Sequence, residues 1–194
     1  MRLFEPLYRR VLALSAHPQA ERYLAALSFA ESSFFPIPPD VMLAPMCLAE
    51  RHRAWRFAAT TTVMSLLGGV AGYAIGYFLI DMIEPWLRSS GSYDSYLRVR
   101  DWFAVWGVWA VFVAGFSPIP YKLFTIAAGA TVLNIPGFLL ASLIGRGARF
   151  FLVAGLIVAG GDRMAAGLQQ HVERIGWAVV VIAVLLGSYF VLRQ

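Results

Sequence analysis

The sequence predicts an all-α integral membrane protein in which two inverted repeats each combine a re-entrant hairpin with a spanning helix. Three observations support this fold class. Hydrophobic residues make up 59% of the 194-residue chain and charged residues only 14%, whereas a soluble domain carries about 25% charge. The motif Phe-x-Pro-Ile-Pro-x-charge occurs twice, at residues 34–40 and 116–122. The charges that flank the two motifs predict opposite orientations in the membrane, as expected for an inverted repeat.

Two closely spaced prolines interrupt a hydrophobic stretch in each copy of the motif. They are Pro36 and Pro38 in the first copy, and Pro118 and Pro120 in the second. Inside a helix, a proline removes an amide donor and clashes with the preceding turn, and in lipid the freed carbonyl groups need another partner. We therefore predict a helix break at each motif. Two such breaks in corresponding halves of a membrane protein indicate a transport site at the repeat interface.

The first repeat is predicted over residues 18–80. Its apolar segments on either side of the first break, residues 19–33 and 41–50, are each shorter than the roughly 20 residues that cross a bilayer. We therefore expect a re-entrant hairpin that enters and leaves the membrane on one side, with a single kinked spanning helix as the alternative. Residues 57–80 follow as a spanning helix.

The second repeat is predicted over residues 102–160. Residues 102–116 and 121–133 flank the second break and are again too short to span, so a second re-entrant hairpin is expected. Residues 135–158 form the spanning helix of this repeat. The polar stretch 81–101 is expected to connect the repeats outside the membrane.

Glycines at helical spacing mark expected helix contacts. Gly68, Gly72 and Gly76 lie at i, i+4 and i+8, which gives a smooth face for close helix packing. Gly145 is expected to serve the same purpose in the second repeat. This pattern favours packing over substrate contact.

The two ends of the chain are expected to form additional membrane helices. Residues 1–17 predict a basic amphipathic helix on the membrane surface, because apolar side chains share one face and arginines lie elsewhere. Residues 161–194 contain an apolar run that predicts a C-terminal transmembrane helix.

The distribution of arginine predicts the orientation of the chain. Arginines lie before and after the first hairpin, at Arg2, Arg9, Arg10, Arg22, Arg51, Arg53 and Arg56. Cytoplasmic loops are enriched in Lys and Arg, so the N-terminus and both ends of this hairpin are expected in the cytoplasm. The connection 81–101 holds three arginines against four acidic residues and is expected outside. The second hairpin then enters from the outside, opposite to the first.

Five ionisable residues fall at expected membrane depth, where charge is costly and usually functional. They are Glu31, Asp40, Lys122, Arg146 and Arg149. Desolvation favours the neutral form of a carboxyl group, so Glu31 and Asp40 are candidates for handling protons. Lys122, Arg146 and Arg149 are candidates for binding a phosphate, since arginine donates two parallel hydrogen bonds to phosphate oxygens. Together they predict a cavity for proton-coupled transport of an anion.

Two structural alternatives stay open for these charges. Asp40 and Lys122 occupy equivalent positions after the two breaks and could form an ion pair across the axis that relates the repeats. Arg146 and Arg149 could lie nearer the cytoplasmic surface if residues 135–158 are shifted along the membrane normal.

Enzyme and cofactor signals are poor. His17, His52 and His171 show no metal-ligand spacing. The sequence contains neither a Gly-x-Ser-x-Gly nucleophile motif nor a Gly-x-x-x-x-Gly-Lys phosphate loop. We expect no enzymatic activity, no metal and no cofactor. The expected partner is a membrane lipid with an anionic head group and not nucleic acid, and a homo-oligomer is left open.

Four stretches of the sequence carry a resemblance to a known family. They are Glu31-Ser-Ser-Phe-Phe-Pro-Ile-Pro-Pro-Asp40, Gly68-Gly-Val-Ala-Gly72-Tyr73-Ala-Ile-Gly76-Tyr77, Phe116-Ser-Pro-Ile-Pro-Tyr-Lys-Leu-Phe-Thr-Ile-Ala-Ala-Gly129 and Gly145-Arg-Gly-Ala-Arg-Phe150. Over roughly residues 20–160 the chain resembles the DedA family of membrane proteins, which carry the VTT (SNARE-associated) domain, and in particular its short YqaA-like branch. The resemblance implies opposed re-entrant hairpins and movement of undecaprenyl phosphate or phospholipids across the bacterial inner membrane, with dependence on the proton motive force. It also implies functional acidic residues at Glu31 and Asp40.

The chain departs from the family pattern at the second break. Better-studied members carry two arginines in a pattern like Arg-Phe-x-Pro-x-x-Arg, whereas Gly115 and Tyr121 stand at those places here and Lys122 supplies the positive charge. The sequence thus predicts a multi-pass inner-membrane transporter for a phosphate-bearing lipid. The alternative from another class is a membrane organiser that assembles partners without transporting anything.

Overall fold

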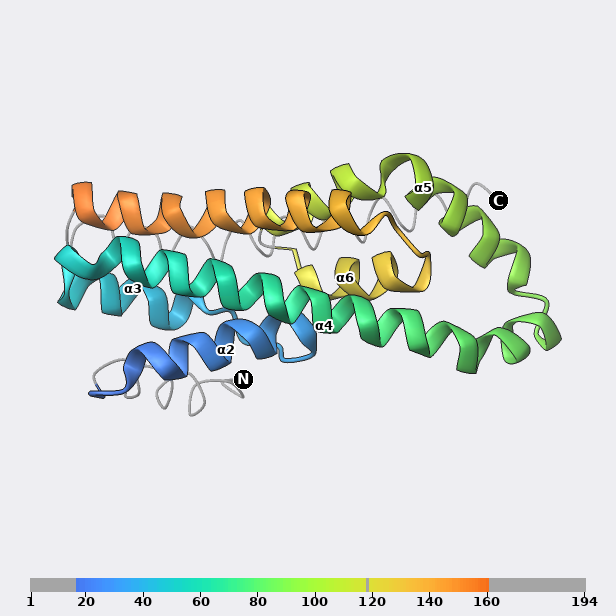
Figure 1. Ribbon diagram of the computed structural model, residues 1–194, viewed down its shortest axis with the longest axis horizontal. Helices are drawn as coiled ribbons and strands as arrows, with labels where there is room; N and C mark the ends of the chain where they lie inside the picture. Colours follow the sequence, from blue (N-terminus) through green and yellow to red (C-terminus); the bar gives the residue numbers. More distant parts are fainter. Residues whose placement is uncertain (1–16, 118, 161–194) are drawn as a thin grey trace, which may run out of the picture.

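The computed structural model describes residues 17–117 and 119–160, which are helical except for short connections (Figure 1). The helices are α2 (Ala20–Ser33), α3 (Asp40–Ala49), the short 3-10 helix η1 (Arg51–Arg53), α4 (Ala54–Ser89), α5 (Tyr93–Phe116), α6 (Tyr121–Ala130) and a last helix, Ile135–Gly160. The predicted surface helix, apart from His17, and the predicted C-terminal helix lie outside the described residues, as does Pro118.

Both predicted helix breaks are confirmed. The first separates α2 from α3 over residues 34–39, and the second separates α5 from α6 over residues 117–120. Among the described residues, three helices are long and apolar enough to cross a membrane, namely Arg51–Ser89 with η1 included, Tyr93–Phe116 and Ile135–Gly160. The described part of the chain is therefore an all-α membrane fold. Re-entrant insertion of the shorter helices stays a prediction.

The central helix α4 organises the molecule. Its 36 residues span about 54 Å at 1.5 Å per residue. Figure 1 shows α4 running along most of the molecule, with α2 along its N-terminal half and α6 along its C-terminal half. Helix α4 thus packs against α2 of the first hairpin and against α6 of the second.

Glycines on α4 permit these close approaches. A Cβ atom at Gly68 would clash with the carbonyl oxygen of Phe29 in α2, and one at Gly76 would clash with the carbonyl oxygen of Ile126 in α6. Gly72 lies between them and faces both partner helices. In lipid, helices associate through close van der Waals packing because the tails are as apolar as the side chains. The α4 glycines therefore set the distance between the hairpins.

The Ile135–Gly160 helix joins two apolar clusters, one for each hairpin. Phe150 packs with residues of α2, α3 and the start of α4, including Leu24, Leu43 and Phe57. Phe138 packs with residues of α5 and α6 in the second cluster. Gly145, between the two clusters, lies against the backbone of α5. This helix consequently crosses both hairpins at the level of their breaks.

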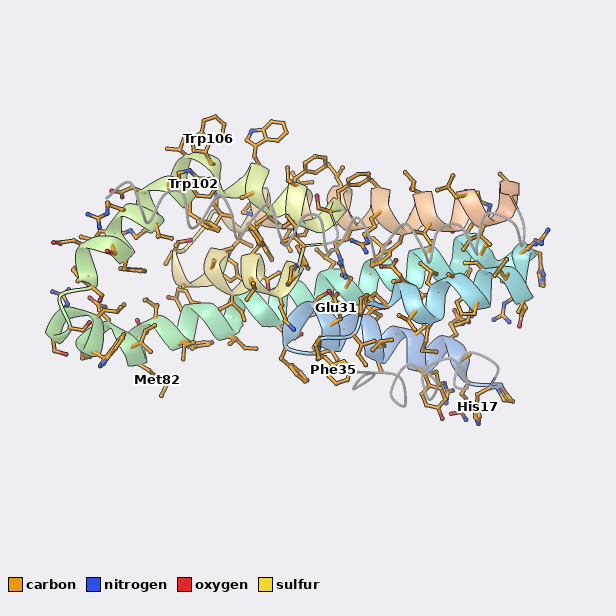
Figure 2. The ribbon with its side chains drawn as sticks, turned by 180° about the vertical axis from the view of Figure 1, so that it is seen from behind. His17, Glu31, Phe35, Met82, Trp102 and Trp106 are labelled. Carbon is orange, nitrogen blue, oxygen red and sulfur yellow. The ribbon has the colours of Figure 1, made fainter. Side chains whose placement is uncertain are left out.

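The predicted extramembrane connection 81–101 is almost entirely helical. Helix α4 continues to Ser89 and α5 begins at Tyr93, so only a short turn separates them. The predicted arm 102–116 is therefore part of a 24-residue helix that is long enough to span. Apolar side chains such as Met82 and Trp102 point away from the two helices in Figure 2.

The charges in this region stabilise helix rather than loop. Arg88 donates to Glu84 at 2.6 Å across one helical turn, an i, i+4 pair that supports a helix. The guanidinium of Arg88 also lies over the ring of Tyr93, 4.2 Å from its centroid. The chain reverses at Gly91, whose φ of 71° is in the left-handed region that glycine adopts without a steric penalty.

Candidate functional site

The five predicted ionisable residues gather where the two breaks meet the Ile135–Gly160 helix. Figure 2 shows Glu31 near the middle of the molecule, close to the C-terminal end of α2, with Phe35 in the adjoining break. Each charge has a partner from a segment distant in sequence. Arg146 pairs with Glu31, Arg149 pairs with Asp40, and the ammonium group of Lys122 lies at backbone carbonyls.

The pair of Arg146 and Glu31 is the more deeply buried one, and we call it the deep pair. The Arg146 side chain is only 3% exposed and that of Glu31 13%. The Arg146 Nη2 also donates to the Ser32 hydroxyl at 3.2 Å, and its Nε donates to Ser65 Oγ in α4 at 2.6 Å. Ser32 in turn donates to Glu31 at 3.0 Å and lies 2.7 Å from Ser65. The deep pair is thus closed by its own hydroxyl network.

Aromatic rings enclose the deep pair from two sides. The Arg146 guanidinium carbon lies 4.8 Å from the ring centroid of Tyr121 and 4.7 Å from that of Phe150. A cation over an aromatic face is attracted by the ring quadrupole, most strongly where water is excluded. A Cβ atom at Gly115 would lie 3.3 Å from the backbone nitrogen of Arg146. Gly115 and Tyr121 therefore both adjoin Arg146.

The pair of Arg149 and Asp40 connects the two breaks, and we call it the outer pair. Arg149 Nη2 donates to Asp40 Oδ2 at 2.6 Å, and its Nη1 donates to the carbonyl oxygen of Ser117 at 2.6 Å. The side chains are 14% and 16% exposed. Asp40 is the first residue of α3, where the helix dipole favours a carboxylate. Arg149 therefore joins the start of α3 to the end of α5.

One oxygen of the outer pair is unsatisfied. Asp40 Oδ1 is buried and has no hydrogen-bond partner within residues 17–117 and 119–160. The hydroxyl groups of Tyr121 and Ser142 share this condition in the described part of the chain. Buried polar atoms are normally hydrogen-bonded, so an unpartnered carboxylate oxygen beside an arginine is a place for a proton or a polar ligand.

Lys122 does not pair with Asp40, so that structural alternative is wrong for the described residues. Its Nζ lies 3.2 Å from the carbonyl oxygen of Phe35 and 3.5 Å from that of Phe34. Asp40 is instead held by Arg149. Equivalent positions in the two repeats thus have different partners, because the Ile135–Gly160 helix supplies the arginine that reaches Asp40.

The sequence of the first break explains why its carbonyls need outside donors. In a continuing helix the carbonyls of Ser32, Phe34 and Phe35 would each accept from the amide four residues later, and each of those residues is a proline. Helix α6 supplies the missing donors. Lys122 donates to the carbonyls of Phe34 and Phe35. The hydroxyl of Thr125 can donate either to the Ser32 carbonyl at 3.3 Å or to the Lys122 carbonyl at 2.9 Å. The second hairpin thus caps the break of the first.

Sequence reasoning missed three hydroxyl groups of the site, those of Ser32, Ser65 and Thr125. Ser65 lies three residues before Gly68 and Thr125 three after Lys122, so each shares a helix face with a residue that was singled out. That spacing is the signal that could have found them. Isolated serines and threonines carry no charge or periodicity that marks them otherwise.

Other parts of the described structure are weaker candidates for a functional site. A surface cleft opens at the N-terminal end of α2, away from the break at its other end; it is lined by Pro18, Gln19, Glu21, Arg22, Ala25, Arg56 and Thr60. Within residues 17–117 and 119–160, no group of three or more His, Cys, Asp and Glu side chains could hold a metal ion. The two breaks therefore remain the strongest candidate site.

Comparison with known proteins places this site in a family. Residues 35–159 match the sequence model of the VTT domain. This chain belongs to the VTT domain, or DedA, family. The matched range includes the second break, the first break from Phe35 on, and four of the five charges, with Glu31 just before its start.

Relatives of this VTT domain protein differ in how much of it they cover. An uncharacterized protein of Haemophilus influenzae is 44% identical over 194 residues, the full length of both chains. Undecaprenyl phosphate transporter A of Staphylococcus aureus is 35% identical over 123 residues, which are 60% of this chain and 56% of that one. An alkaline phosphatase-like protein of Lactococcus lactis is 25% identical over 185 residues, 88% of this chain and 86% of that one. No solved structure matches.

Proposed function

We propose that this VTT domain protein is a transporter that moves a phosphate-bearing lipid, a phospholipid or a polyprenyl phosphate, across the bacterial inner membrane with coupling to protons. The observation that carries the proposal is the outer pair, in which one arginine holds a carboxylate and also joins the two helix breaks. An intramembrane arginine next to interrupted helices is a typical site for an anionic substrate.

A lipid phosphate would compete with Asp40 for Arg149. The carboxylate presents one oxygen to Nη2 at 2.6 Å, and a phosphate offers oxygens of the same kind to the same fork. A proton arriving at the unpartnered Asp40 Oδ1 would neutralise the carboxylate and weaken its hold on Arg149. Phosphate binding and Asp40 protonation would therefore favour each other.

The overall charge of the site supports an anionic substrate. Three cations and two carboxylates surround the breaks, which leaves one net positive charge. In the proposal, Glu31 is a second proton-handling group and Arg146 holds it close to the substrate path. One relative is named as an undecaprenyl phosphate transporter, and this name supports the choice of a phosphate-bearing lipid over other anions.

Transport also needs the opposite orientation of the two hairpins, with the N-terminus in the cytoplasm. We propose that α2 and α3 enter from the cytoplasmic side and that the α4–α5 turn lies outside, as the arginine distribution predicts. Single cysteines at His52 and Ser92, in a chain whose buried Cys47 is replaced by alanine, test this with a membrane-impermeant thiol reagent on intact cells. Only the cysteine at position 92 should react. Reaction of both would rule out the inverted arrangement.

The alternative function, a membrane organiser without transport, is favoured by one observation. Both ion pairs are closed within the protein, as expected for charges that only stabilise a scaffold. The transport proposal interprets the same closure as the substrate-free state, in which Asp40 occupies the place of the phosphate.

Reconstitution in liposomes tests the proposal. Purified protein should speed the movement of a labelled phospholipid or polyprenyl phosphate between leaflets, and Arg149→Met should lower the rate by tenfold or more. Arg88→Met is the matched control, because Arg88 belongs to an exposed ion pair with Glu84 on a distant part of α4 and should keep the rate. If folded wild-type protein moves neither lipid, the organiser is the better account.

A further inference from the structure

The first helix break contains two adjacent carbonyl oxygens that face a cation of the chain itself. Phe34 and Phe35 accept from Lys122 Nζ at 3.5 and 3.2 Å. Their usual amide donors are absent because the residues four positions later are Pro38 and Pro39. These two oxygens therefore depend on a donor from outside their own helix.

We propose that the Phe34 and Phe35 carbonyls form a binding site for a primary ammonium ion, which Lys122 fills with its own side chain. Lys122 is then a positioning residue that holds the first break against α6, and it is not a ligand for the substrate's phosphate. Unwound backbone in membrane proteins commonly binds cations through such carbonyls. Here the cation is tethered one residue after the start of α6.

The surrounding charges support this assignment. The two nearby carboxylates already have arginine partners, Glu31 with Arg146 and Asp40 with Arg149. Lys122 is consequently left to neutral oxygens, whose partial charges and hydrogen-bond demand suit a compact group with three donors. A phosphate that drew the ammonium away would leave both carbonyls without a donor.

The neighbouring Thr125 is a second group of α6 within hydrogen-bond distance of the residues at the break. Its hydroxyl lies one turn after Lys122 and donates either to the Ser32 carbonyl at 3.3 Å or to the Lys122 carbonyl at 2.9 Å. The hydrogen bond between Lys122 Nζ and the Phe34 carbonyl is exposed, so a small cation can reach this carbonyl from the surface. The site is therefore accessible to chemical rescue.

The test uses purified full-length protein and thermal unfolding, so it does not depend on lipid transport. Lys122→Ala removes the ammonium and leaves space, and the unfolding temperature should fall by several degrees. Methylammonium, ethylammonium or propylammonium should restore it in a saturable manner. Tetramethylammonium has the charge but no N–H donor and should not. Lys122→Met fills the space with an uncharged chain and should gain nothing from any amine.

A second variant covers the case in which Lys122→Ala does not fold. Lys122→Cys can be converted with an aminoethyl thiosulfonate, which rebuilds an ammonium group, or with a methyl thiosulfonate, which does not. The other cysteine, Cys47, is fully buried and therefore protected from both reagents. The untreated wild type is the control. Only the aminoethyl product should recover the wild-type unfolding temperature. The proposal is overturned if Lys122→Ala unfolds at the wild-type temperature. It is also overturned if tetramethylammonium stabilises Lys122→Ala as much as the primary amines do, or if the primary amines stabilise Lys122→Met equally. Equal unfolding temperatures for the two thiosulfonate products of Lys122→Cys would overturn it as well.

Discussion

The arginines of the two ion pairs lie one turn apart on the Ile135–Gly160 helix, yet the pairs differ in burial and in how many of their polar atoms are hydrogen-bonded. In the deep pair, Arg146 is 3% exposed, bonded to Glu31 and two serines, and enclosed by two aromatic rings. In the outer pair, Arg149 is 14% exposed and Asp40 keeps one oxygen without a partner in the described structure. We therefore expect the deep pair to act as a structural lock and the outer pair to act as an exchange site.

The comparison separates the effect of burying an ion pair from the effect of satisfying all of its hydrogen-bonding atoms. A buried pair whose partners are all satisfied resists change, because removing one member leaves an uncompensated charge. In a pair whose carboxylate has one unpartnered oxygen, the carboxylate can accept a proton at that oxygen, and the arginine can then bind a competing anion at a lower cost in free energy. We therefore propose the outer pair as the substrate site and expect the deep pair, whose Glu31 is the second proton-handling group, to contribute more to stability. Single substitutions can separate the two contributions.

The largest loss of stability is expected for Arg146→Met. This change leaves Glu31 charged and buried beside apolar rings, which costs about 3–5 kcal/mol. Chemical unfolding in detergent measures it. Adding Glu31→Gln should recover more than half of the loss, since no unpaired charge then remains. If the double variant is as unstable as the single one, the deep pair is not the lock described here.

A smaller loss is expected for Arg149→Met, about 2–3 kcal/mol, because the outer pair is more exposed and makes fewer contacts. The variant should fold and keep its helical content while it loses lipid movement. Unfolding measured beside Arg146→Met gives the order of the two effects. A greater loss for Arg149→Met than for Arg146→Met would reverse the assignment of lock and exchange site.

The smallest loss is expected for Ser65→Ala, about 1–2 kcal/mol. It removes the acceptor for Arg146 Nε, which lies at 2.6 Å, and leaves a buried donor unpaired. Thr60→Ala is the matched control on the same helix, since Thr60 makes only a 3.3 Å bond to Glu21 near the surface. Equal unfolding curves for the two variants would show that the hydroxyl network does not strengthen the deep pair.

The sequence was sufficient to predict the helix breaks and the residues around them, because proline acts locally and intramembrane charge is rare. It was insufficient for the ends of α4 and α5, because the polar composition of residues 81–101 did not show that they continue one helix and begin the next. It also suggested a contact between Asp40 and Lys122 from their equivalent positions, whereas the partner of Asp40 comes from a third segment. Contacts of that kind depend on tertiary packing, and the hydroxyl groups of Ser65 and Thr125 are marked in the sequence only by their helical spacing from Gly68 and Lys122.

The central claim, that a lipid phosphate and Asp40 compete for Arg149, makes opposite predictions for the two members of the outer pair. Binding of a phospholipid or a polyprenyl phosphate to purified protein, measured by native mass spectrometry, tests it directly. Asp40→Asn should increase the bound lipid severalfold, Arg149→Met should decrease it by tenfold or more, and Glu31→Gln in the deep pair should change it little. If Asp40→Asn and Arg149→Met both weaken binding, or neither changes it, the outer pair is not the phosphate site.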